Sequence, residues 1–125
     1  MTILLLAAAG GLGAVCRFLA DAVVARRNPF RMPLGTLLIN VTGSLLLGVL
    51  TGMLTAAPPD STGATVRGVL GTGFCGGYTT FSTASVETVR LWLAEGRSTG
   101  VGYAAATLVA SVAAAALGLW LGGIL

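Results

Sequence analysis

Four long runs of residues with little or no charge constrain this chain more than any other feature. They cover about residues 2–24, 33–57, 66–93 and 100–123, and the third becomes mixed in character after Val86. A membrane-spanning helix needs about 20 predominantly apolar residues. We therefore expect an all-α membrane protein, one domain of four transmembrane helices joined by short connections and surrounded by membrane lipid.

Composition excludes several classes of function. Only 9% of the residues are charged, whereas a soluble domain carries roughly 25%. The absence of His and Lys, and of any cluster of carboxylates, indicates that the chain is not an enzyme. The seven Arg are too scattered for a nucleic-acid surface. Cys16 and Cys75 lie in apolar runs, which favours small buried thiols.

The distribution of arginine predicts the topology. The first run is interpreted as a membrane helix, not a cleaved signal peptide, because its Arg residues follow the apolar core instead of preceding it. With four spans, the first and third loops share one side of the membrane. That side collects Arg26, Arg27, Arg31, Arg90 and Arg97, against Arg67 alone on the other. The positive-inside rule then puts these loops in the cytoplasm and both termini outside, in a plasma membrane.

Polar and small residues form a row along the second run. The row repeats at i,i+4 and consists of Thr36, Asn40, Ser44, Gly48 and Gly52. Gly48 and Gly52 form a GxxxG motif, which favours close helix packing. An amide at mid-membrane depth is costly unless it is satisfied. Asn40 therefore either bonds a neighbouring helix or faces a polar cavity, and the sequence leaves both open.

The fourth run repeats this arrangement. Tyr103, Thr107 and Ser111 follow one another at i,i+4, and Gly118 and Gly122 form a second GxxxG motif. For this helix the pattern favours packing against a neighbour.

The third run contains the strongest local signal. Gly76 and Gly77 are followed by threonines, a combination that disfavours a helix. A break here would free carbonyls to coordinate a cation, as in discontinuous transporter helices. Beyond it, Thr79, Thr83 and Glu87 repeat at i,i+4 on one face. The alternative is a continuous glycine-rich packing helix whose hydroxyls bond back to carbonyls.

Arg17 lies inside the first run. One interpretation is that it reaches the interface or pairs with Asp21 at i+4. The other is that it anchors carbonyls of the broken helix or attracts anions. The sequence does not decide between them.

Three motifs in order resemble the Fluc (CrcB-type) fluoride channels of bacterial membranes. They read GGxGxxxR over 10–17, GTLxxNxxG over 35–43 and GFCGGYTTFST over 73–83. Any one glycine motif is weak, but three of them in a four-span chain are specific, and the likeness covers essentially the full length.

The resemblance implies an antiparallel dimer with two narrow fluoride pores and a structural sodium ion at its centre. By motif position, the sodium carbonyls fall on Gly76 and Thr79. The pore residues fall on Asn40, Phe81, Ser82 and Thr83, with Tyr103 as a looser match. Glu87 falls near a pore mouth, and Arg17 matches the Arg of the first helix.

These residue types suit a small, strongly hydrated anion. The amide and hydroxyl groups supply hydrogen-bond donors, and a phenyl ring presents its positive edge. One position departs from the family pattern, because Ala84 stands where a second Phe is expected. Together with the five-to-one arginine bias, this suggests a heterodimer with a homologous second subunit. A homodimer that tolerates both features is the alternative.

The competing function is a small four-helix, proton-coupled exporter of the multidrug type. Such an exporter needs a carboxylate deep in the first helix. Asp21, near the helix end, is the only candidate. A membrane assembly factor without transport is a third class, which would not require polar groups facing cavities.

Overall fold

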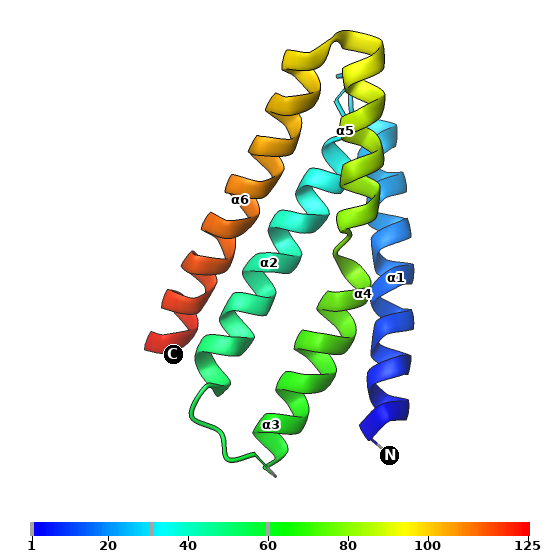
Figure 1. Ribbon diagram of the computed structural model, residues 1–125. Coiled ribbons are helices and arrows are strands. Elements are labelled where there is room, and N and C mark those ends of the chain that lie inside the picture. Colours follow the sequence, from blue (N-terminus) through cyan, green and yellow to red (C-terminus); the bar gives the residue numbers. More distant parts are fainter. Residues whose placement is uncertain (1, 31, 60) are drawn as a thin grey trace.

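The computed structural model describes residues 2–30, 32–59 and 61–125, and every secondary-structure element in this part of the chain is a helix (Figure 1). The elements are α1 (Thr2–Arg27), α2 (Leu34–Leu54), α3 (Thr62–Val66), η1 (Arg67–Cys75), α4 (Gly76–Tyr78), α5 (Phe81–Glu95) and α6 (Arg97–Ile124). The all-α expectation is confirmed. Met1, Arg31 and Asp60 lie outside the described residues, so the share of Arg31 in the charge bias stays a prediction.

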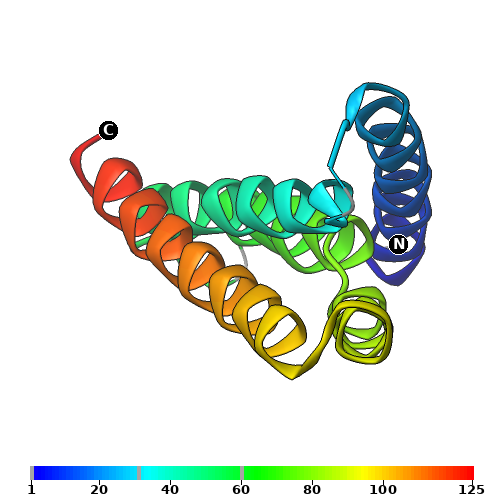
Figure 2. The same ribbon diagram turned by 90° about the horizontal axis from the view of Figure 1, so that it is seen from above.

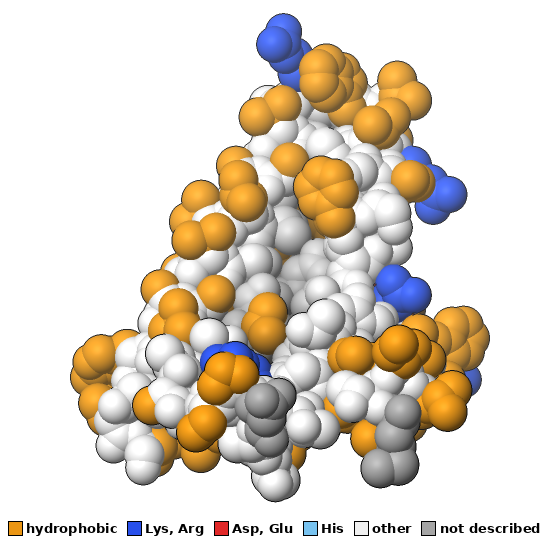
Figure 3. All heavy atoms as spheres, turned by 60° about the horizontal axis from the view of Figure 1, so that its bottom comes forward, with side chains coloured by type: hydrophobic (Ala, Val, Ile, Leu, Met, Phe, Trp, Pro, Cys, Tyr) orange, Lys and Arg blue, Asp and Glu red, His pale blue; other side chains and the backbone are white. Residues whose placement is uncertain are grey.

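Among the described residues, three helices are long and apolar enough to cross a membrane. These are α1, α2 and α6, with mean hydropathies of 2.0, 1.9 and 2.0. The fourth expected span is discontinuous: α3, η1 and α4 follow one another directly, and α5 continues beyond a short gap (Figure 1). Many large apolar side chains lie on the face that Figure 3 shows. Phe18 is 73% and Leu93 82% exposed. This is a multi-pass membrane protein.

Both chain ends lie at one end of the bundle, together with the connection between α2 and α3 (Figure 1). The α1–α2 and α5–α6 connections lie at the opposite end. This is the arrangement that four spans require. The α5–α6 connection is the single residue Gly96, whose φ of 105° is a backbone conformation that favours glycine.

Helix α2 occupies the middle of the bundle. It packs closely along α6 on one side, and α1 packs on η1 and α4 on the other (Figure 2). The α2–α6 contact depends on the expected glycines: a Cβ on Gly118 would collide with the carbonyl oxygen of Leu45, and one on Gly48 with that of Ala115. Gly13 and Gly77 have the same role between α1 and the third span. The two GxxxG motifs are therefore packing motifs.

The first half of the third span differs from the plain helix that its sequence suggests. Residues Arg67–Cys75 form a π-helix, a rare form with i→i+5 hydrogen bonds. Gly71, Gly73 and Cys75 are its buried residues. Gly73 lies against α1, where a Cβ would come within 3.0 Å of the Leu6 carbonyl oxygen. Small residues thus allow α1 to approach this wider helix.

Replacing Gly118 with Ala is expected to separate α2 from α6, because the new Cβ has no space beside the Leu45 carbonyl. Overpacking of this kind costs about 1–3 kcal/mol, so the thermal midpoint in detergent should fall. Gly102→Ala, in the same helix with nothing within 4 Å of its Cβ position, is the matched control. Equal midpoints for the two variants would contradict this packing role.

Candidate functional site: a helix break beside a polar cavity

The third span breaks at Thr79 and Thr80. Their backbones are extended, with φ/ψ of −77°/160° and −150°/121°. The break expected near Gly76 and Gly77 is thus present, but these two glycines are themselves helical, in α4. The break therefore lies two to three residues further along the chain than the sequence predicts. The reason is a contact with α2, which the helix propensity of the local sequence does not reflect.

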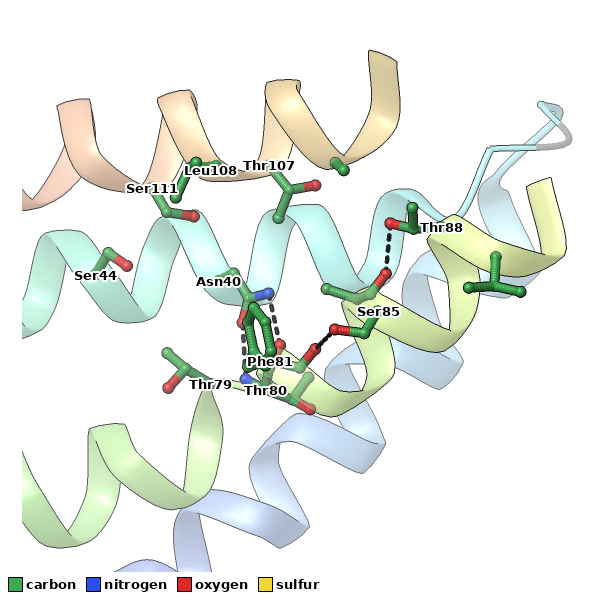
Figure 4. Close-up of a pocket in the computed structure, with 13 residues that line it drawn as sticks. Asn40, Ser44, Thr79, Thr80, Phe81, Ser85, Thr88, Thr107, Leu108 and Ser111 are labelled. Carbon is green, nitrogen blue, oxygen red and sulfur yellow. Dashed lines mark hydrogen bonds between the residues drawn. The ribbon is translucent and has the colours of Figure 1, made fainter. Parts of the chain in front are cut away.

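That contact is a paired hydrogen bond between the Asn40 side chain and the Thr80 backbone. Asn40 Nδ2 donates to the Thr80 carbonyl oxygen at 2.9 Å, and the Thr80 N–H donates to Asn40 Oδ1 at 2.8 Å (Figure 4). Asn40 is 9% exposed. The two possibilities for Asn40 are therefore both realised: it bonds a neighbouring helix, and it also lines a cavity. One N–H of its amide remains for a further acceptor.

The break redirects the hydrogen bonds of two carbonyl groups. The helical ladder still reaches Thr79, whose N–H donates to the Cys75 carbonyl at 2.9 Å. The Thr80 N–H, which would bond Gly76 O in a continuous helix, goes to Asn40 instead. The Thr83 N–H, which would bond Thr79 O, goes to Thr80 Oγ1 at 3.1 Å. The carbonyls of Gly76 and Thr79 thereby lose their usual helical donors.

Thr80 also caps the helix that follows. Its hydroxyl accepts the Thr83 N–H, lies 3.0 Å from Thr83 Oγ1 and 3.3 Å from Ser82 Oγ. Ser82 and Thr83, both predicted pore residues, are thus gathered at the start of α5. Neither contributes to the cavity that Asn40 lines. Within one chain the structure does not bring them together with Asn40, and their pore role stays a prediction.

A cavity of about 540 Å³ lies between α2, α5 and α6 (Figure 4). Its wall on α5 is the face that carries Phe81, Ala84, Ser85 and Thr88, not the face of Thr83 and Glu87. The complete lining is Asn40, Ser44, Thr79, Thr80, Phe81, Ala84, Ser85, Thr88, Val89, Ala104, Thr107, Leu108 and Ser111. The cavity is largely apolar, with polar groups from α2 and α6 around the break.

Two hydroxyls on the α6 wall have no hydrogen-bond partner within the described chain. They are Thr107 Oγ1 and Ser111 Oγ, both buried. On the α5 wall, in contrast, Ser85 and Thr88 donate back to the carbonyls of Phe81 and Ala84. Buried hydroxyls are normally satisfied, so Thr107 and Ser111, which both line the cavity, retain unused hydrogen-bonding capacity there. Sequence reasoning assigned their i,i+4 row to packing and missed this.

Phe81 lies at the rim of the cavity. Its ring is 88% exposed, and it is the first residue of α5, directly after the break. Ala84, one turn later, contributes only a methyl group to the same wall. The phenyl group is therefore presented to whatever covers this side of the molecule.

Glu87 and Tyr103 lie outside the cavity and contact each other. The Tyr103 hydroxyl donates to Glu87 Oε2 at 2.9 Å and lies 3.3 Å from the Pro33 carbonyl oxygen. Tyr103 is 2% exposed. The structure therefore places this predicted pore residue within the helix packing.

Arg17 is half-buried on α1. Asp21 does not pair with it within the described chain, because its carboxylate lies against Gly35 in the first turn of α2. Negative charge is favourable at that position, where backbone N–H groups are free. The proposed Arg17–Asp21 pair is absent.

Comparisons with known proteins agree on one family. The family described as "CrcB-like protein, Camphor Resistance (CrcB)" matches residues 4–119. A "Fluoride-specific ion channel FluC 2" of Cutibacterium acnes is 52% identical, over 98% of both chains. A "Fluoride-specific ion channel FluC 1" of Leifsonia xyli subsp. xyli is 48% identical over 99% of this chain and 88% of its own length. A FluC 2 of Mycobacterium tuberculosis is 44% identical over 90% and 83%.

Replacing Asn40 with Leu is expected to destabilise the break. The similar-sized apolar side chain would leave the N–H and C=O of Thr80 buried without this partner, at a cost of about 1–3 kcal/mol for each unsatisfied group. Thermal unfolding in detergent measures the loss. Thr42→Val, which removes a hydroxyl of α2 that bonds only within its helix and to Tyr78, is the control. A stability loss no larger than that of the control would contradict a stabilising role of the hydrogen-bond pair between Asn40 and Thr80, which we call the clamp.

Proposed function

Because this chain belongs to the CrcB-like family, we propose that it is a subunit of a fluoride-specific ion channel. It lets fluoride leave the cytoplasm passively across the bacterial plasma membrane and so relieves fluoride toxicity. It is not an enzyme. The single observation that carries this function is the donor set in the cavity: the remaining Asn40 N–H and the unpartnered hydroxyls of Thr107 and Ser111.

The donor set fits fluoride by its chemistry. A small anion leaves water only if donors replace its hydration shell, because an unpaired charge in an apolar medium is very costly. Amide N–H and hydroxyl groups are neutral donors, so they stabilise an anion without trapping it as a fixed cation would. The edge of the Phe81 ring, which carries positive potential, adds a further contact where the ion passes the break.

The proton-coupled exporter is not supported. Its mechanism needs a carboxylate that faces the transport path and exchanges protons. Asp21 lies instead at the first turn of α2, and Glu87 is bonded to Tyr103 outside the cavity. The curated relatives are named as fluoride channels.

The same proposal includes a structural sodium ion held by the carbonyls of Gly76 and Thr79. The redirected hydrogen bonds at the break fit this role, since carbonyls without helical donors are the ligands that broken membrane helices offer to cations. When bound, the ion would supply positive charge near the anion path. Two carbonyls do not fill the coordination shell of a cation, so a second chain related by a two-fold axis would supply the remaining ligands.

An antiparallel dimer is the matching assembly. Gly76 is exposed, and nothing lies within 4 Å of its Cβ position, which leaves room for a second backbone at the carbonyl site. The exposed Phe81 ring would then be covered by the partner chain and face a pore. In this assembly Ser82 and Thr83 are assigned to the pore wall by the family pattern, and Glu87 and Arg17 to its mouths.

Replacing Asn40 with Asp should abolish fluoride flux. The carboxylate puts negative charge against the anion and no longer donates to the Thr80 carbonyl. Fluoride efflux from liposomes, with chloride as the reference ion, measures this, and Phe81 or Thr83 substitutions should reduce flux less. The matched control is Asn28→Asp, in the loop before α2, which should keep most of the flux. Undiminished flux with Asp at position 40 would remove Asn40 from the pore.

The partner in this dimer is proposed to be a homologous second chain. An antiparallel homodimer must insert in both orientations, yet the arginine bias favours one orientation. Ala84 in place of a phenyl group further suggests that the intact pore comes from the partner. A heterodimer explains both the arginine bias and Ala84 if the homologue carries the opposite arginine bias and both phenyl groups.

Expression of this chain alone tests the heterodimer. We expect little fluoride flux from the purified single chain, and recovery of flux when a homologue of opposite bias is co-expressed. Epitope tags on the termini report orientation, because a fixed chain exposes them on one side only. Robust flux with tags on both sides of the membrane would establish the homodimer instead.

A further inference from the structure

A buried tyrosine joins three separate parts of the chain at the end of the bundle opposite the termini. Tyr103 of α6 is among the most completely buried side chains, at 2% exposure. Its hydroxyl donates to Glu87 of α5 at 2.9 Å and lies 3.3 Å from the carbonyl of Pro33, the residue before α2. The Tyr103 side chain of α6 thus contacts α5 and the residue that precedes α2.

Helix α5 depends on such a contact more than the other helices do. The break at Thr79 and Thr80 separates it from the rest of its span, and it packs mainly on α6, with little contact to α2. Its first turn is held by the pair between Asn40 and Thr80. Glu87 supplies a second polar attachment, nearly two turns further along the helix.

The hydrogen bond between the Tyr103 hydroxyl and the Glu87 carboxylate belongs to a strong class. A hydrogen bond to a carboxylate is shorter and roughly twice as strong as one between neutral groups. A carboxylate on a membrane-spanning segment is costly unless it has a partner, and the phenol is a donor already buried beside it. Among the described residues, the Pro33 carbonyl also accepts a long 3.5 Å bond from the Leu37 N–H.

We infer that Tyr103 is a positioning residue: through Glu87 it fixes α5, and thereby the distance between the cavity walls on α5 and α6. Phe81, Ala84 and Thr88 form one wall, and Thr107, one turn from Tyr103, forms the facing wall. Tyr103 itself does not reach the cavity. For fluoride transport the inference rests on the proposed function, but the attachment of α5 is independent of it.

The first experiment measures this attachment without fluoride. Hydrogen exchange of the backbone amides of residues 81–95 is followed in detergent for the wild type and for Tyr103→Phe. Losing one hydrogen bond to a charged group should speed exchange in α5 by about tenfold or more. Tyr78→Phe is the matched control, since its phenol contacts a neutral hydroxyl, Thr42 Oγ1, at 3.2 Å. Unchanged exchange in the Tyr103→Phe variant overturns the inference.

The second experiment separates positioning from ion binding. Glu87→Gln keeps an acceptor for the phenol and should retain most of the protection of α5, whereas Glu87→Leu should lose it. The double variant Tyr103→Phe, Glu87→Leu should exchange no faster than the faster single variant, because one contact is removed twice. Additive effects would show that the two side chains act separately and would overturn the inference.

Flux completes the test in liposomes, with the homologous chain present if the single chain is silent. Tyr103→Phe should lower the fluoride-to-chloride flux ratio per active channel, because the cavity walls are no longer held at one distance. A structural role in stability alone would reduce the number of active channels and leave this ratio unchanged, which would overturn the inference. A wild type without fluoride flux, but with the expected exchange pattern, would remove the proposed function and leave the attachment of α5 intact.

Discussion

The architecture depends on the side chain of Asn40, which hydrogen-bonds a peptide group in the way that a second backbone segment would. The amide of Asn40 donates to and accepts from the Thr80 peptide group, as a neighbouring strand would in a sheet. Extended backbone at membrane depth is tolerated only where protein satisfies its polar groups, and Asn40 does so within the bundle. The same hydrogen-bond pair diverts the Thr80 N–H from the Gly76 carbonyl. Asn40 therefore both holds the break and leaves the Gly76 carbonyl without its helical donor.

The glycines on the other helices make this clamp geometrically possible. Without a hydrophobic drive between helices in lipid, close packing of small residues holds such bundles together. Gly48 and Gly118 bring α2 against α6, while Gly13 and Gly77 bring α1 against the third span. Asn40 is thereby held at a fixed depth opposite the break. The cavity beside it lies where α5, released by the break, meets α6.

Much of the fold and part of the site could be predicted from the sequence. Charge-free runs predicted the membrane segments, and the GxxxG spacing predicted close packing of α2 and α6 without naming their neighbours. The roles of hydroxyls could not be predicted, because a Thr or Ser in a helix bonds its own turn unless a neighbour blocks or frees it. Ser85 and Thr88 bond back, whereas Thr107 and Ser111 do not. Both pairs lie on one face of a helix, three residues apart in α5 and four in α6, so spacing does not distinguish them.

The sequence by itself determined the class of molecule, placed glycines that disfavour a helix in the third span, and showed that the Asn40 amide needs a polar partner. These follow from hydropathy, glycine content and the cost of a buried amide, all local quantities. Only the tertiary structure decided that the break falls at Thr79 and Thr80, past the glycines. It also decided that Tyr103 faces Glu87 and Pro33 rather than the cavity. Both depend on which helix lies opposite, because a hydrogen-bond partner distant in sequence has no signature in local spacing.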